Sequence, residues 1–180
     1  MRLILVRHPQ PQIAPGICYG STDLPALPEE IERVHAALMP TLPRDAALFS
    51  SPLRRCAKLA TRLNWPTLTF DARLAEMDFG AWEMQPWDAI PRAQIDAWAA
   101  DLTGYHPGGG ESVLQMAARV ADFYADLQRQ PQQDAIVICH AGTMRLLSAC
   151  HANLPLHDIA LQAAQSPHKI GYGETIILRR

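Results

Sequence analysis

The stretch Leu3-Ile4-Leu5-Val6-Arg7-His8-Pro9 decides the fold class of this chain. A short, continuous run of branched apolar residues is typical of a strand that is buried on both faces of a sheet. Pro9 lacks a backbone N–H and disfavours helix at His8, so we expect the strand, residues 2–7, to end here. Arg7 and His8 then lie at the carboxyl edge of a central strand, where open α/β sheets bind ligands. From this stretch alone, an ordinary strand end with a solvated arginine and histidine is an equal alternative.

A second stretch repeats this pattern near the other end of the chain. The apolar run 134–139 leads into His140, and the small residues Ala141-Gly142-Thr143 open a predicted helix. Helix N–H groups at such a corner point toward whatever binds there. A lone histidine at this position is more often structural, but two strand ends with a histidine favour a shared site.

Length, composition and charge limit the classes of protein to consider. The 180 residues, 48% hydrophobic and 19% charged, predict one globular domain over residues 1–180. A net charge of −2 gives no basic excess for nucleic acid or an anionic membrane, although a small basic pocket is compatible with it. The four cysteines show no CxxC spacing, and the first apolar run is too short for a signal peptide or a membrane span. We therefore expect a cytoplasmic protein with reduced thiols.

Apolar runs and helical periodicities alternate along the chain. Strands are predicted at residues 2–7, 46–49, 67–70, 134–139, 159–163 and 175–178. Helices are predicted at residues 28–39, 87–101 and 111–129. Two more helices are predicted to begin at Pro52, with Ser51 as N-cap, and after His140. This alternation predicts an α/β fold with a mainly parallel sheet, helices on both faces and a site at the carboxyl edge.

The segment 9–25 is a long loop rich in proline and glycine. Loops of this length in compact domains are usually functional, and this one follows His8 directly. Gly20 and its polar neighbours could offer backbone N–H groups to an anion. An ordinary surface loop is the alternative.

Arg54 and Arg55 fall in the first turn of the helix predicted after Ser51. The helix dipole disfavours cations at this end. Arginines at this position make sense if an anion binds there. Two solvated arginines are the alternative.

Residues 73–83 mix carboxylates with aromatic residues, and Glu76 and Asp78 are candidate proton donors. A carboxyl beside apolar walls has a raised pKa, which suits a proton donor. A solvated loop is an equal alternative from this stretch alone.

Several further residues are expected to have structural roles only. Trp87 and Trp98 are predicted to pack in the interior rather than to stack on a ligand.

No Cys/His spacing indicates zinc, and no glycine pattern indicates a dinucleotide or Walker site, so we expect no metal and no cofactor. The histidines predicted to lie at the surface or at helix caps are His151, His157 and His168.

Taken together, the polar candidates suit phosphate chemistry. Two arginines and a histidine at a helix N-terminus form a phosphate pocket, because the guanidinium fork matches phosphate oxygens. A second, neutral histidine can act as nucleophile, and a carboxylic acid can protonate the leaving oxygen.

Five blocks follow one another along the sequence: Leu5-Val6-Arg7-His8, Ser51-Pro52-Leu53-Arg54-Arg55-Cys56, Leu74-Ala75-Glu76-Met77-Asp78-Phe79-Gly80-Ala81-Trp82-Glu83, Pro107-Gly108-Gly109-Gly110-Glu111-Ser112 and Cys139-His140-Ala141-Gly142. In this order they resemble the histidine phosphatase superfamily, which includes the cofactor-dependent phosphoglycerate mutases. Each block is weak evidence alone, but their order is specific. The resemblance extends from residue 2 to about 150.

The resemblance implies a three-layer α/β/α sandwich like that of phosphoglycerate mutases and a metal-independent acid-type histidine phosphatase. His8 would form a phosphohistidine, and Glu76 would protonate the leaving alcohol and then help water attack. The remaining groups would bind the phosphate or substrate: Arg7, Arg55 and His140, with Tyr19, Gly20 and Ala141.

Three residues depart from the family pattern. Pro9 replaces the usual Gly, Gln10 the usual Glu or Thr, and Cys139 the commoner Ser. Pro9 removes an N–H and backbone freedom, but none of the changes removes a catalytic group, so we expect activity to survive.

The blocks around Tyr19 and Asp78 look most like the alpha-ribazole phosphatase-like branch. Phosphatase is favoured over mutase, because mutases are longer and carry an insertion that closes over the substrate. The expected partner is a small phosphate ester such as alpha-ribazole 5′-phosphate, not nucleic acid or membrane, and a homodimer is left open. Two alternatives remain: a phosphoglycerate mutase and a non-catalytic module that binds a phosphorylated ligand.

Overall fold

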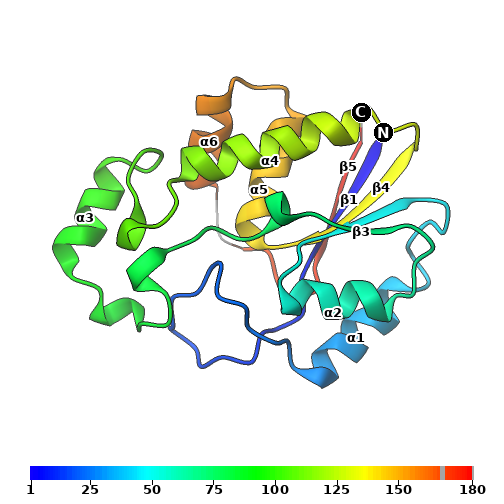
Figure 1. Ribbon diagram of the computed structural model, residues 1–180, viewed down its shortest axis with the longest axis horizontal. Helices are drawn as coiled ribbons and strands as arrows, with labels where there is room; N and C mark the ends of the chain where they lie inside the picture. The colour runs from blue at the N-terminus through cyan, green and yellow to red at the C-terminus, as the bar shows by residue number, and fades with distance from the viewer. Residues whose placement is uncertain (167–168, 180) are drawn as a thin grey trace.

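One five-stranded sheet forms the centre of the computed structural model, which describes residues 1–166 and 169–179. The strand order is β3-β2-β4-β1-β5. The neighbours among the first four strands pair in parallel, whereas β5 pairs antiparallel with β1. The predicted mainly parallel α/β fold is therefore confirmed (Figure 1). The strands are β1 (Arg2–Arg7), β2 (Ala47–Ser50), β3 (Leu68–Phe70), β4 (Asp134–Cys139) and β5 (Thr175–Leu178).

Helices cover both faces of this sheet and complete the three layers (Figure 1). One face is covered by α1 (Pro28–Leu38) and α2 (Arg54–Arg62). The other face is covered by α4 (Val113–Gln128), α5 (Ala141–His151) and α6 (Leu156–Gln165). The remaining helix, α3 (Arg92–Ala100), stands to one side of the layers.

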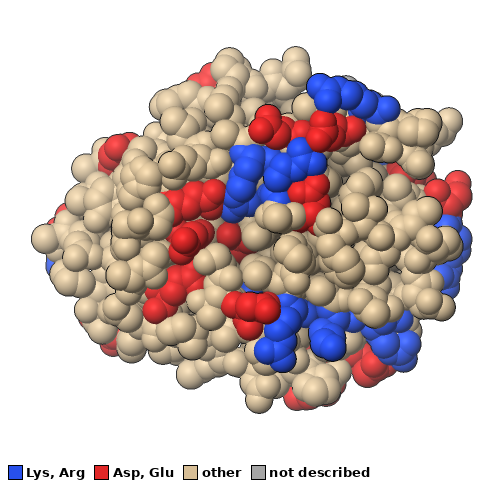
Figure 2. Space-filling view, viewed as in Figure 1, with Lys and Arg blue, Asp and Glu red and all other residues tan. Residues whose placement is uncertain are grey.

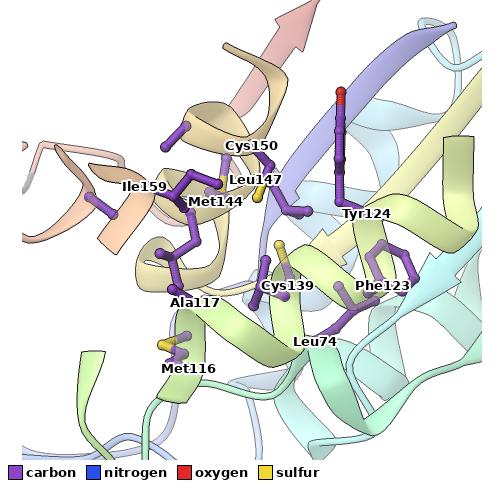
Figure 3. Close-up of a cluster of buried hydrophobic side chains, with 14 of the residues drawn as sticks. Leu74, Met116, Ala117, Phe123, Tyr124, Cys139, Met144, Leu147, Cys150 and Ile159 are labelled. Carbon is purple, nitrogen blue, oxygen red and sulfur yellow. The ribbon is translucent and has the colours of Figure 1, made fainter. Parts of the chain in front are cut away.

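The strand side chains alternate between two hydrophobic cores. In β1, Leu3 and Leu5 belong to the core beneath α4, α5 and α6, whereas Ile4 and Val6 belong to the core beneath α1 and α2. Both faces of the strand are thus buried, which explains its unbroken apolar run. Figure 3 shows part of the first core, in which Phe123 from α4 and Leu147 from α5 are among the buried side chains.

Local sequence accounts for where α1 and α4 begin. Pro28 is the first residue of α1, and acidic residues occupy its first turn. At α4, Ser112 and Gln115 form a capping box: the Ser112 Oγ accepts from the Gln115 N–H at 3.2 Å, and the Gln115 Oε1 accepts from the Ser112 N–H at 3.0 Å.

The predicted start of α2 is wrong by a few residues. The N-cap is Leu53 and the first helical residue is Arg54, so Ser51 and Pro52 precede the helix. The Ser51 Oγ lies 2.9 Å from the His140 Nε2, and the Asp23 carboxylate accepts from the Arg54 N–H at 2.6 Å. A residue distant in sequence thus satisfies the helix start, which a local pattern does not reveal.

Two further element predictions are corrected. Residues 159–163, predicted as a strand, lie in α6, where Ile159, Ala160 and Ala163 are buried at helical spacing. The helix predicted over 87–101 is divided into a 3-10 turn, Trp87–Ala89, and α3, because Pro91 ends the first and precedes the second.

The direction of β5 places one more segment at the carboxyl edge of the sheet. Thr175, the first residue of β5, pairs with Val6 near the end of β1. The turn before β5, which contains Tyr172, therefore lies beside Arg7 and His8. The histidine predicted at position 168 lies outside the described residues.

Acidic and basic side chains lie next to one another across the middle of the face in Figure 2. Within residues 1–166 and 169–179, no helix is long and apolar enough to cross a membrane.

Candidate active site

Two histidines meet at the carboxyl edge of the sheet. His8 follows β1 and His140 follows β4, and these strands are adjacent, with Arg7 opposite Cys139. The His8 N–H donates to the Cys139 carbonyl at 3.0 Å, which locks the two strand ends together. The imidazole centroids are 5.0 Å apart, and both residues are buried.

The hydrogen-bond partner of His8 indicates which ring nitrogen carries the proton. The His8 Nδ1 lies 2.7 Å from the Pro9 carbonyl oxygen. A carbonyl only accepts, so Nδ1 must donate, and the neutral ring keeps its lone pair on Nε2. Burial, with the positive charges of Arg55 and Arg7, holds the pKa of His8 well below its usual range. The residue that replaces the family's usual glycine thus supplies the oxygen that orients His8.

Arg55 is fully buried in the first turn of α2. Its Nη1 donates to the Thr22 carbonyl at 2.8 Å and its Nη2 to the Gly20 carbonyl at 2.5 Å. The Tyr19 ring centroid lies 5.4 Å from its Cζ. The loop that follows β1 therefore holds the guanidinium through its backbone oxygens.

Backbone N–H groups of this same loop donate to a carboxylate of the protein itself, that of Glu83. The Glu83 carboxylate accepts from the N–H groups of Ser21 at 2.8 Å, Thr22 at 2.7 Å and Phe79 at 3.0 Å. Burial opposes ionisation of Glu83, but the hydrogen bonds from Thr22, Phe79 and Ser21 outweigh it and lower its pKa. The backbone at Met77 also lies very close to Gly20, because a Cβ at position 20 would be 1.9 Å from the Met77 carbonyl oxygen.

Arg7 is held by the turn that precedes β5. Its Cζ lies 4.1 Å from the Tyr172 ring centroid, and its Nη1 donates to the Ile170 carbonyl. The hydroxyls of Tyr172 and Tyr19 are 2.9 Å apart, and the Tyr172 ring lies 5.6 Å from that of His8.

His140 has its own partners at the N-terminus of α5. Its Nε2 lies 2.9 Å from the Ser51 Oγ and 3.5 Å from the Cys56 Sγ. Burial, with the charges of Arg55 and the neighbouring His8, lowers the pKa of His140 well below its usual range. Burial also raises the pKa of Cys56 to about 12, so its thiol stays protonated. His140 is therefore a neutral ring at neutral pH in the free protein.

The Glu76 carboxylate lies against the first turn of α5. Its Oε2 accepts from the Gly142 N–H at 3.0 Å and its Oε1 from the Met77 N–H at 3.1 Å. A Cβ at Gly142 would lie 2.3 Å from Oε1, so only glycine permits this approach. Asp78, the other candidate proton donor, is exposed, and its carboxylate accepts from the Gly80 N–H at 2.8 Å.

A cavity of about 460 Å³ opens over these groups. Its lining includes six of the predicted site residues: Arg7, His8, Tyr19, Arg55, Glu76 and Ala141. Two predicted site residues are not part of this lining: the His140 ring lies 5.0 Å from that of His8, with its Nε2 against Ser51, and Gly20 contributes its carbonyl to Arg55. In the part of the chain that the structure describes, no group of three or more His, Cys, Asp and Glu could hold a metal ion.

A family model described as the histidine phosphatase superfamily, branch 1, matches residues 3–169 of the chain. The chain belongs to this superfamily. A curated relative is the glucosyl-3-phosphoglycerate phosphatase of Mycobacterium tuberculosis, 29% identical over 178 residues that cover 86% of this chain and 77% of the relative.

Solved structures of histidine phosphatases agree with this assignment. The mycobacterial glucosyl-3-phosphoglycerate phosphatase in complex with VO3 has a TM-score of 0.80 at 26% identity, covering 99% of this chain and 92% of that one. A proposed alpha-ribazole-5′-P phosphatase from Escherichia coli has a TM-score of 0.74 at 28% identity, covering 88% and 83%. The family, the fold and the assignment as a phosphatase are thereby shown.

Sequence reasoning missed four contributors to this site. Tyr172 was not singled out from the sequence, yet it flanks Arg7 and His8; its signal was an aromatic residue between two glycines just before a strand. Ser51 was expected as a helix cap, yet its hydroxyl contacts His140. Trp87 and Trp98 were expected to pack in the interior, yet both line the cavity, and Trp87 is exposed.

Proposed function

We propose that this histidine phosphatase is a metal-independent phosphomonoesterase that works through a phosphohistidine at His8. The observation that carries the proposal is the hydrogen bond from the His8 Nδ1 to the Pro9 carbonyl. It leaves the unprotonated Nε2 as the nucleophile, beside two arginines and a second histidine.

In the first step, the phosphate group lies between Arg7 and Arg55 at the cavity wall, beside the pair of His8 and His140. The His8 Nε2 attacks phosphorus, the bond from phosphorus to the leaving oxygen breaks, and the Glu76 carboxyl gives its proton to that oxygen. The guanidinium groups stabilise the charge that spreads over the phosphoryl oxygens. Both Arg7 and Arg55 keep a buried Nε–H that has no partner among the described residues.

In the second step, water replaces the alcohol. The Glu76 carboxylate takes a proton from the water, whose oxygen attacks phosphorus while the bond from phosphorus to Nε2 breaks. Phosphate leaves, His8 is neutral again and Glu76 is protonated for the next cycle.

For the substrate, we propose a small phosphorylated metabolite, with alpha-ribazole 5′-phosphate as the specific candidate. The sequence blocks around Tyr19 and Asp78 and the likeness to the Escherichia coli protein support this choice. A phosphoglycerate mutase is the second candidate, but the chain between Glu76 and His140 is short for the insertion that closes mutase sites. A non-catalytic binding module would be expected to lack the nucleophile or the acid, whereas His8 and Glu76 are both present in this chain.

Phosphate release from a panel of esters tests the proposal. The panel contains p-nitrophenyl phosphate, 3-phosphoglycerate, sugar and nucleoside monophosphates and alpha-ribazole 5′-phosphate, assayed with EDTA and beside His8→Ala. We expect turnover that resists EDTA and disappears in the variant. Binding of these phosphates without turnover would instead indicate the binding module.

A further inference from the structure

The cavity over His8 extends well beyond the space that a phosphate group fills. From the phosphate end it continues between α3 on one side and α4, α5 and α6 on the other. Figure 1 shows α3 standing beside this group of helices, apart from the sheet. Its volume of about 460 Å³ lies in the range of pockets for whole small molecules. We call the part of the cavity beyond the phosphate end the leaving-group pocket, because whatever fills it is bonded to the phosphate.

Apolar side chains make up most of the leaving-group pocket. On the outer wall, the segment from 87 to 102 contributes Trp87, Ile95, Trp98, Ala99 and Leu102. The inner wall comes from three helices and consists of Val113, Met116, Leu146, Ala163 and Ala164.

Aromatic rings make part of the outer wall flat and stiff. Trp87 and Trp98 lie nearly parallel, with 11° between their planes. Phe79, which also lines the cavity, meets Trp98 edge-on at 6.0 Å and Trp87 at 5.8 Å. Trp87 keeps 39% of its surface exposed, so a ligand that covers it would bury further apolar surface.

One cation besides the two phosphate-binding arginines lines this cavity. Arg7 and Arg55 serve the phosphate, and the third cation in the lining is Arg145. The Arg145 Nη1 donates to the Ser166 carbonyl at 3.3 Å, while its buried Nε has no hydrogen-bond partner among the described residues. Burial lowers the pKa of Arg145, and the nearby Glu76 opposes this shift. Arg145 is thus a single cation on walls that are otherwise largely apolar.

We propose that the substrate is a phosphomonoester whose leaving group is largely apolar, a ring system or a hydrocarbon chain that covers the Trp98 wall. This inference rests on the proposed function and names its substrate class. A leaving group with many hydroxyls, such as a sugar or glycerate, would lose hydration against these walls and find few hydrogen-bond partners.

A series of alkyl phosphates measures the pocket without changing the chemistry. Propyl, butyl, pentyl, hexyl and 3-phenylpropyl phosphate have leaving alcohols of similar acidity, so kcat/KM differences report binding of the leaving group. We expect kcat/KM to rise about threefold to fourfold per buried methylene, and 3-phenylpropyl phosphate to exceed propyl phosphate by about 30-fold or more. Glycerol 1-phosphate and 3-phosphoglycerate should fall at or below propyl phosphate.

A pair of variants on α3 assigns the effect to this wall. Ala99 lines the cavity, whereas Ala97, two residues earlier on the same helix, is exposed and does not. Ala99→Phe fills the pocket and should lower the ratio of kcat/KM for 3-phenylpropyl over propyl phosphate about tenfold. Ala97→Phe, the matched control, should leave that ratio at the wild-type value, and urea unfolding of both variants checks that they fold.

The outcomes separate this inference from the proposed function. A flat alkyl series, a preference for 3-phosphoglycerate, or equal effects of the two variants would overturn the apolar leaving group while the phosphatase stands. Absence of turnover with any ester, including p-nitrophenyl phosphate, would overturn both.

Discussion

At the scale of single residues, the proposed reaction depends on the protonation state of His8. The Pro9 carbonyl fixes the proton on Nδ1, and burial beside Arg55 lowers the pKa of the ring. Because the pKa is lowered, the ring should remain neutral as the pH falls through 6.5, where an ordinary histidine becomes charged. NMR of histidine-labelled protein checks this, with His8→Asn to assign the signal and urea-unfolded protein as the reference. A folded-state titration of His8 at or above that of the unfolded chain would contradict the account.

Gly142→Ala tests the position of the proton donor. The added Cβ would lie 2.3 Å from the Glu76 Oε1 and would force the carboxylate away from the first turn of α5. We expect kcat for an alkyl phosphate, whose leaving alkoxide needs a proton, to fall about 10- to 100-fold.

p-Nitrophenyl phosphate is the internal control for this variant, because its leaving group departs without a proton. Its turnover should change far less. An equal loss for both esters would show that the substitution disturbs more than proton donation.

Most residues of the site could be predicted from the sequence, because they lie where strands end or helices begin. Arg7, His8 and His140 follow apolar runs, and the structure brings them together with Arg55 and Glu76. Tyr172 was not predicted, because it lies at the site only when β5 runs antiparallel to β1. That direction arises from long-range strand pairing and not from a local sequence pattern.

At the scale of elements, the loop after β1 is held by one carboxylate. Glu83 accepts hydrogen bonds from Ser21, Thr22 and Phe79, and the same loop presents the carbonyls that hold Arg55. Glu83→Gln replaces one acceptor oxygen with an NH2 group that faces N–H donors. We expect a loss of about 1–3 kcal/mol in the free energy of unfolding and a raised KM.

Urea unfolding and steady-state kinetics measure both effects of Glu83→Gln. Glu29→Gln, at an exposed acid in the first turn of α1, is the matched control. If Glu83→Gln were as stable and as active as this control, the loop would not depend on Glu83.

The elements also show where local pattern fails. The apolar residues of 159–163 are compatible with a short strand or with a helix. Their packing against α4 and α5 favours the helix α6. The start of α2 was placed too early because Ser51 is a good capping residue. Its hydroxyl contacts His140 and accepts from the Leu53 N–H at 3.3 Å, just before the helix, and the Asp23 carboxylate accepts from the Arg54 N–H.

At the scale of the whole molecule, two buried neutral histidines link stability to pH. The pKa values of His8 and His140 are lowered in the folded state, so below pH 6.5 the unfolded chain binds more protons than the folded one. Stability should therefore be complete above about pH 7.5 and fall below pH 6.5 by about 1.4 kcal/mol per pH unit for each histidine.

Urea unfolding at pH 7.5, 6.0 and 5.5 measures this slope. His140→Asn should remove about half of it, while His157→Asn, at a side chain that is 65% exposed, serves as the control. Stability that stays constant or rises between pH 7.5 and 5.5 would contradict the account.

The overall architecture was the most predictable level. The apolar runs 2–7 and 134–139 indicated strands buried on both faces, and the alternation with helices indicated a parallel sheet; both are confirmed. The strand order and the place of α3 were not predictable, because they arise from contacts between distant segments. The leaving-group pocket was missed for the same reason, since its two walls are far apart in sequence.

Detection of phosphate on His8 during turnover tests the phosphohistidine mechanism most directly. Rapid quenching into alkali preserves phosphohistidine, and mass spectrometry of the digested protein locates it. We expect the peptide that contains His8 to gain one phosphoryl group within the first turnover, and His8→Ala to gain none. Phosphate on another residue, or steady turnover without any phosphorylated enzyme, would contradict the mechanism.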